Sequence, residues 1–82
     1  MSRKRRSLVH ATVAKIVGDD YAVTYPVQDY GELTTDSSVT FSLSVWRGKR
    51  GMLSEGLVVK LSEVALHQQG WRAGWAQPVL AA

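Results

Sequence analysis

A regular alternation of apolar and polar side chains over residues 39–46 constrains the fold more than any other feature of the sequence. The segment reads Val-Thr-Phe-Ser-Leu-Ser-Val-Trp, with an apolar side chain at every second position up to Val45. Successive side chains of a β-strand point to opposite faces, so a period of two is typical of a half-buried strand. The alternation therefore predicts that Phe41 faces a core and that Thr40 and Ser42 face outward.

Four further segments have β-favouring composition and are separated by turn residues. They comprise residues 8–17, 21–25, 57–61 and 70–79. Residues 27–38 and 47–56 are connections rich in turn residues, and Pro26 removes a ladder donor at the end of the second strand. Residues 61–69 also have apolar positions at helical spacing, with Gly70 as a candidate C-terminal cap, so one helical turn remains open there. Five closely spaced short strands predict an all-β class, either a closed barrel or a sandwich.

The length of 82 residues allows one compact domain and is too short for two independent cores. A hydrophobic content of 45% is enough for that domain to fold. Residues 1–7 are polar and basic without periodicity, so they are interpreted as a mobile arm. Residues 8–80 are assigned to the single barrel.

The inventory of reactive side chains argues against catalysis and against a cofactor. The sequence has no cysteine and only two histidines, His10 and His67, so thiolate metal sites and disulfides are excluded. Asp19 and Asp20 are adjacent, which on extended backbone points them to opposite faces rather than pairing them for acid/base chemistry. We expect a protein without enzymatic activity, metal or cofactor. The lack of cysteine and of a membrane-spanning apolar run predicts a cytoplasmic location and no membrane partner.

The basic residues are grouped in two places, which makes a polyanion the natural partner to test. One group is the N-terminal arm and the other lies in the glycine-rich connection. Their members are Arg3, Lys4, Arg5 and Arg6, and Arg47, Lys49 and Arg50. Both groups are interpreted as phosphate contacts, and a solvated loop and a solubilising arm are the alternatives.

Aromatic side chains supply the other half of a surface for single-stranded nucleic acid, because bases stack on them. Tyr21 and Tyr25 share one face of their predicted strand, and either base stacking or cross-strand packing would account for them. Trp71 and Trp75 share a face if residues 70–79 are extended. Large rings in so small a domain are usually needed for the core, and this interpretation is also favoured for Trp46.

The order of these features resembles the cold-shock domain family over residues 11–79. Residues 40–46 look like that family's F-F-H-x-S-x-hydrophobic segment. The pair Glu55 and Gly56 and the strand residues 59–61 are similar to parts of its L-x-E-G-x-x-V-x-F segment. Residues 70–73 resemble its G-x-x-A closing strand, and residues 11–15 its opening G-x-V-K-W. The resemblance implies a small five-stranded antiparallel OB-type barrel that binds single-stranded RNA and DNA.

Several departures from the family pattern remove stacking groups from the implied binding face. Lys15 stands where the family has a tryptophan, Val23 loses an aromatic ring, and Thr40 and Ser42 replace a phenylalanine and a histidine. Each missing group is worth roughly 1–3 kcal/mol of base stacking. Binding should therefore depend mainly on phosphate contacts, be sensitive to salt and read sequence poorly.

Together these observations predict non-catalytic binding of single-stranded nucleic acid, with RNA favoured over DNA. The sheet face would consist of Lys15, Tyr21, Tyr25, Thr40 and Ser42. The arm and the basic connection would add phosphate contacts. The alternative is a protein-interaction module, with a protein partner, on an OB barrel that has lost most of its stacking surface.

Overall fold

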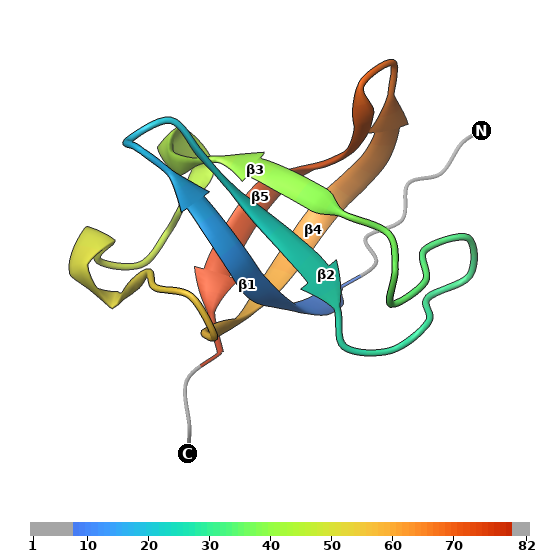
Figure 1. Cartoon of the computed structure of the whole chain (residues 1–82), viewed down its shortest axis with the longest axis horizontal. Coiled ribbons are helices and arrows are strands. Elements are labelled where there is room, and N and C mark those ends of the chain that lie inside the picture. The colour runs from blue at the N-terminus through green and yellow to red at the C-terminus, as the bar shows by residue number, and fades with distance from the viewer. Residues whose placement is uncertain (1–7, 80–82) are drawn as a thin grey trace.

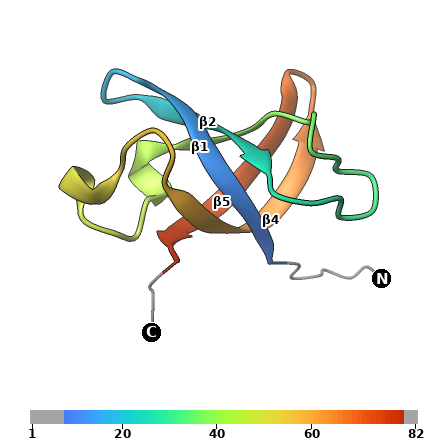
Figure 2. The same ribbon diagram turned by 60° about the horizontal axis from the view of Figure 1, so that its bottom comes forward.

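Five strands and two short 3₁₀ turns make up the computed structural model, which describes residues 8–79 (Figure 1). The strands are β1 (Val9–Val17), β2 (Tyr21–Pro26), β3 (Val39–Ser42), β4 (Val58–His67) and β5 (Gly70–Pro78), and the turns are η1 (Leu43–Val45) and η2 (Arg50–Met52). The predicted basic arm and residue 80, the last of the predicted domain, lie outside the described residues. Residues 27–38 and the segment that carries η2 lie at opposite ends of the molecule (Figures 1 and 2).

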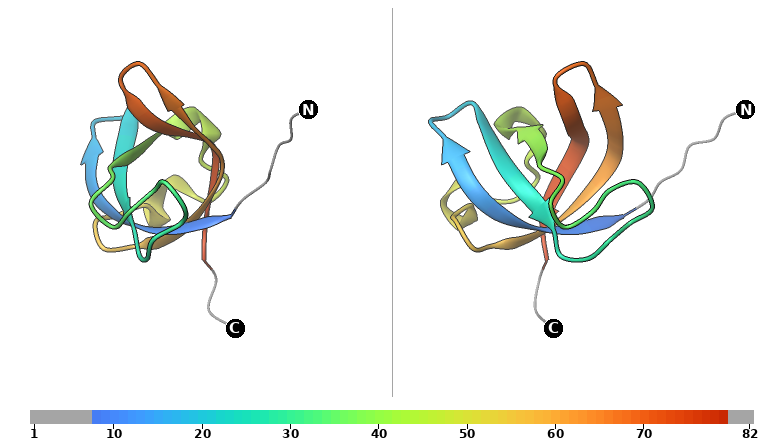
Figure 3. Two further views of the ribbon diagram at one scale, coloured as in Figure 1. Left: turned by 90° about the vertical axis from the view of Figure 1, so that its right-hand side faces the viewer. Right: turned by 45° about the vertical axis from the view of Figure 1, so that its right-hand side comes forward.

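The strands form a closed barrel in the order β1-β2-β3-β5-β4, with β4 paired back to β1 (Figure 3). The small five-stranded OB-type barrel expected from the sequence is confirmed. Four pairings are antiparallel, whereas β3 and β5 run parallel, so the barrel is mixed rather than wholly antiparallel. A ring of five strands cannot reverse direction at every pairing because five is an odd number. One parallel pair is therefore required by closure.

The core fills the inside of the barrel with alternate residues of the strands. The fully buried side chains of largest volume are Phe41, Leu61, Val9, Val13, Val39, Val59 and Thr24. Phe41 faces inward, as the alternation predicted, and its ring stacks on that of Trp46 with 5.9 Å between the ring centroids. Trp46 also packs against the core, as favoured from the sequence, and thereby attaches the chain after η1 to the barrel.

The third strand is shorter than predicted, because it ends at Ser42 and not at Trp46. The Ser42 side chain accepts a hydrogen bond from the backbone N–H of Ser44 at 3.2 Å and caps η1. Such local bonds offer the backbone an alternative to the sheet ladder. Leu43 and Val45 remain half-buried against the core, so the apolar pattern is kept although the strand is not.

The helical alternative for residues 61–69 is wrong, because β4 continues through this segment to His67. Glu63 interrupts the strand with a φ of 55°. It lies opposite Gly74, between the pairs Ser62–Trp75 and Val64–Ala73. A Cβ atom on Gly74 would lie only 2.8 Å from Oε1 of Glu63, so glycine leaves room for this side chain.

The same interruption separates the two tryptophans that were expected to share a face. Trp71 packs against the core. Trp75 pairs with Ser62, one position beyond the buried pair of Leu61 and Ala76, and therefore lies on the outer side of the barrel.

A buried hydroxyl provides a test of how the barrel holds β2 against β3. Thr24 is fully buried, and its Oγ1 donates a hydrogen bond to the carbonyl oxygen of Val39 at 2.8 Å. The substitution Thr24→Val keeps the shape but removes the donor, so the free energy of unfolding should fall by about 0.5–1.5 kcal/mol. Urea unfolding would measure the change. The matched control Thr40→Val alters a half-buried hydroxyl with a longer bond of 3.4 Å, and an equal or larger loss there would contradict the argument.

Candidate nucleic-acid interface

The outer face of β1, β2 and β3 carries both tyrosines named from the sequence. Tyr21 pairs with Val17 of β1 and Ser42 of β3, and Tyr25 pairs with Thr12. The exposed fractions of Tyr21 and Tyr25 are 37% and 40%, so both rings keep surface that a base could cover. Base stacking, the interpretation given from the sequence beside cross-strand packing, would cover this surface.

Lys15 joins this face because of an irregularity in β1. Val13 is buried, and simple alternation would turn the side chain two positions later inward as well. A register shift between Val13 and Lys15 instead pairs Lys15 with Val23, and Lys15 is exposed. The bulge therefore moves a cation to the side of the sheet that carries the tyrosines.

A second cation, Arg72, completes a row across four strands. The register pairs Lys15 with Val23, Val23 with Thr40, and Thr40 with Arg72 of β5. Arg72 is exposed and precedes the buried Ala73, so it points outward. Sequence reasoning missed Arg72, because its place beside Thr40 depends on the parallel β3·β5 pair. We call Lys15, Tyr21, Tyr25, Thr40, Ser42 and Arg72 the sheet face.

The aliphatic hydroxyl groups of Thr40 and Ser42 are held by neighbouring atoms. Oγ1 of Thr40 donates to the carbonyl oxygen of Trp71 at 3.4 Å, and Oγ of Ser42 lies 2.8 Å from Oγ of Ser44. A hydroxyl has one donor and two acceptor positions, so both groups retain hydrogen-bonding capacity toward a ligand.

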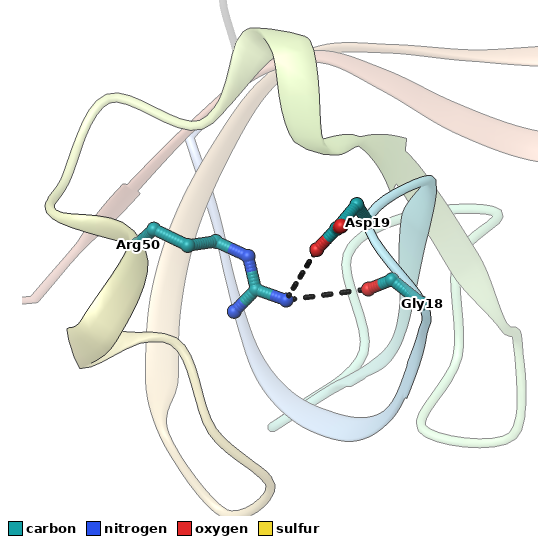
Figure 4. Close-up of polar contacts among 3 residues, drawn as sticks. All are labelled: Gly18, Asp19 and Arg50. Carbon is teal, nitrogen blue, oxygen red and sulfur yellow. Dashed lines mark hydrogen bonds and ion pairs between the residues drawn. The ribbon is translucent and has the colours of Figure 1, made fainter.

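Arg50 connects the η2 turn to the turn between β1 and β2 (Figure 4). Its Nη2 donates to the carbonyl oxygen of Gly18 at 3.2 Å and lies 3.5 Å from Oδ1 of Asp19. The Asp19 side chain is almost entirely exposed, so solvent screens this ion pair. The structure therefore places Arg50 close to the start of β2, where Tyr21 follows the turn.

Arg47 and Lys49 occupy a different part of the surface from Arg50. They line a pocket together with His10 of β1 and Lys60 of β4. In the barrel order β4 neighbours β1 and β5, whereas β2 neighbours β1 and β3. The outer side of β4 thus faces away from the tyrosines of β2. The three cations of the predicted loop are consequently divided between two sites.

Four of the predicted nucleic-acid contacts belong to the basic arm at the start of the chain. Arg3, Lys4, Arg5 and Arg6 lie outside the described residues. Within residues 8–79, no group of three or more His, Asp or Glu side chains is placed to hold a metal ion. Over the same range, no helix has the length and apolar character needed to cross a membrane.

Comparison with protein-family models, curated proteins and solved structures finds no match.

Proposed function

We propose that the protein binds single-stranded nucleic acid on the sheet face, without catalysis. The observation that carries this proposal is the row in which Lys15 and Arg72 stand at the two ends of a surface with two exposed tyrosine rings. Aromatic rings beside cations are the combination that single strands require, because bases stack and phosphates follow the charges. The resemblance to cold-shock domains favours the same class of ligand.

The composition of the sheet face favours phosphate contacts over base recognition. Only Tyr21 and Tyr25 offer rings there, and Val23 between them is aliphatic. Two stacked bases contribute roughly 1–3 kcal/mol each, with little dependence on which base is stacked. Affinity should therefore be modest, strongly dependent on salt and nearly independent of sequence.

The hydroxyl groups favour RNA over DNA as the ligand. Thr40 and Ser42 lie on β3, between the tyrosines of β2 and the strand β5 that carries Arg72. A ribose 2′-OH can donate to or accept from such groups, and deoxyribose cannot. Bases within a duplex are already stacked on each other, so duplexes should bind more weakly than single strands.

Fluorescence anisotropy with labelled single-stranded RNA, single-stranded DNA and the matching duplexes, at two salt concentrations, tests the proposal. We expect the order RNA, DNA, duplex in decreasing affinity, with weaker binding at the higher salt. A folded protein that binds none of these at low salt would contradict the proposal. That result would favour a protein-interaction module instead.

Removing the two cations at the ends of the row should weaken binding to every sequence alike. In the double variant Lys15→Gln and Arg72→Gln, two phosphate contacts are lost, so the slope of log affinity against log salt should fall by about 1.4. Anisotropy titrations over a salt series measure this slope. The matched control, Lys49→Gln with Lys60→Gln, removes the same charge from the other side of the barrel, and the strands used for this comparison carry no terminal phosphate. An equal fall in slope for the control would contradict the assignment to the sheet face.

A further inference from the structure

A second basic site lies outside the sheet face, in a pocket of about 570 Å³ between the η1–η2 segment and strands β1, β4 and β5. Cationic or ionisable side chains reach it from three segments of the chain. His10 comes from β1, Lys60 from β4, and Arg47 and Lys49 from the connection after η1. Volumes of roughly 300–1,000 Å³ are typical of sites for small molecules.

The barrel register builds the floor of this pocket. His10 pairs with Lys60, and Lys60 pairs with Gln77, so three polar side chains stand in a row across β1, β4 and β5. The neighbouring residues Val59 and Ala76 are buried, which turns this row outward. The backbone N–H of His10 donates to the hydroxyl of Tyr30 at 3.0 Å and secures the edge of the row.

The segment that carries Arg47 and Lys49 lies beside β5 and is held in place by hydrogen bonds. The N–H of Arg47 donates to the carbonyl oxygen of Ala76 at 2.8 Å, and Nε1 of Trp46 donates to the carbonyl oxygen of Lys49 at 3.0 Å. Gly48 is packed so tightly that a Cβ atom would lie 2.8 Å from both Pro78 and Trp46. The backbone that carries Arg47 and Lys49 is therefore held in one conformation before any ligand binds.

Within the described part of the chain, no acidic side chain neutralises the positive charge of the pocket. No aspartate or glutamate is among its lining residues, and within residues 8–79 none of Arg47, Lys49 and Lys60 forms an ion pair. Cations held together without a carboxylate repel one another unless an anion is present. The planar fork of an arginine beside two lysines matches the oxygens of a phosphate group.

We propose that this pocket binds the phosphate monoester of a nucleotide, with Arg47, Lys49 and Lys60 around the phosphate. Met52, Pro78 and Val79 supply an apolar wall against which the nucleoside can pack, and Gln77 offers an amide for hydrogen bonds. The nucleotide is either free or the phosphorylated end of a strand, because both present the same group. This site does not depend on the proposed function of the sheet face.

Titration of the ¹⁵N-labelled full chain with adenosine 5′-monophosphate, followed by amide NMR spectra, tests the pocket. Saturable shifts are expected at residues 47–49, 60 and 77, and not at residues 21 and 25. Adenosine without phosphate should produce no saturable shifts. Parallel titrations with a short oligonucleotide, with and without a 5′-phosphate, show whether the phosphate of a strand end is also accepted. Dependence on that phosphate at residues 47–49 and 60 would also support the proposal.

Single variants distinguish specific nucleotide binding in the pocket from nonspecific attraction of anions to a basic protein. Arg47→Gln or Lys60→Gln should weaken nucleotide binding roughly tenfold, because each removes a charge-assisted hydrogen bond. The control, Lys15→Gln with Arg72→Gln, should leave it unchanged, and the spectra report directly that each variant is folded. Absence of saturable shifts with both phosphate probes, or equal loss in the control, would overturn the proposal. Oligonucleotide binding at Tyr21 and Tyr25 with no response in the pocket would overturn this inference alone.

Discussion

Replacement of Phe41 by alanine is expected to lower the free energy of unfolding by about 3–5 kcal/mol. Phe41 is completely buried and is the largest fully buried side chain among the described residues. Alanine would lose the transfer free energy of the ring and leave a cavity that the closed barrel cannot collapse to fill. It would also remove the stacking partner of Trp46, which pairs with Ala76 and attaches the following segment to β5.

Urea unfolding followed by circular dichroism measures this loss. Small domains have only about 5–15 kcal/mol of stability, so Phe41→Ala could fail to fold altogether. The variant Phe41→Leu, which keeps more of the volume, should lose less and stay measurable. Ser54→Ala, at an exposed position, should change stability by less than about 0.5 kcal/mol. A stability for Phe41→Ala within 1 kcal/mol of the unmodified protein would contradict the assigned role.

Phe41 also shows why the class of fold could be predicted from sequence. Alternation needs only local information, because the side chains of one strand define its two faces. Residues 39–46 carry this pattern in full, so the inward position of Phe41 and the outward positions of Thr40 and Ser42 followed from it. The end of β3 did not, because the alternation continues to Val45, whereas the N–H of Ser44 donates to Oγ of Ser42 and starts a 3₁₀ turn that a period of two does not indicate.

The misleading helical spacing in residues 61–69 has a structural explanation. Leu61 is buried and Val64 packs against the core, three positions apart. In an uninterrupted strand these two residues would face opposite sides. The positive φ of Glu63, opposite Gly74, resets the alternation and turns both inward. An interruption of a period-two pattern can therefore imitate the period of a helix.

The sites were only partly predictable, because they depend on pairings between distant parts of the chain. Arg72 enters the sheet face through the parallel pair of β3 and β5, which no local pattern indicates. Lys15 reaches that face through a bulge. Arg47 and Arg50 are close in sequence and looked like one phosphate-binding unit, yet the η2 turn directs them to different surfaces.

The largest expected effect on binding comes from removing both rings of the sheet face. Tyr21→Ala with Tyr25→Ala should cost roughly 1–3 kcal/mol for each lost base contact, which corresponds to a loss of affinity of about 30-fold or more. The two residues are four positions apart on one strand, a separation of about 13 Å, so their contributions should be nearly additive. Anisotropy titration with a single-stranded RNA at low salt measures the loss.

The salt dependence of the same variant distinguishes stacking from charge effects. Because no cation is removed, the slope of log affinity against log salt should stay that of the unmodified protein. The control, Tyr21→Phe with Tyr25→Phe, keeps both rings and should retain most of the affinity, since stacking needs the ring and not the hydroxyl. Unchanged affinity in the alanine variant would mean that phosphate contacts alone hold the strand. An equal loss in the phenylalanine variant would mean that the tyrosine hydroxyls, and not their rings, contact the ligand.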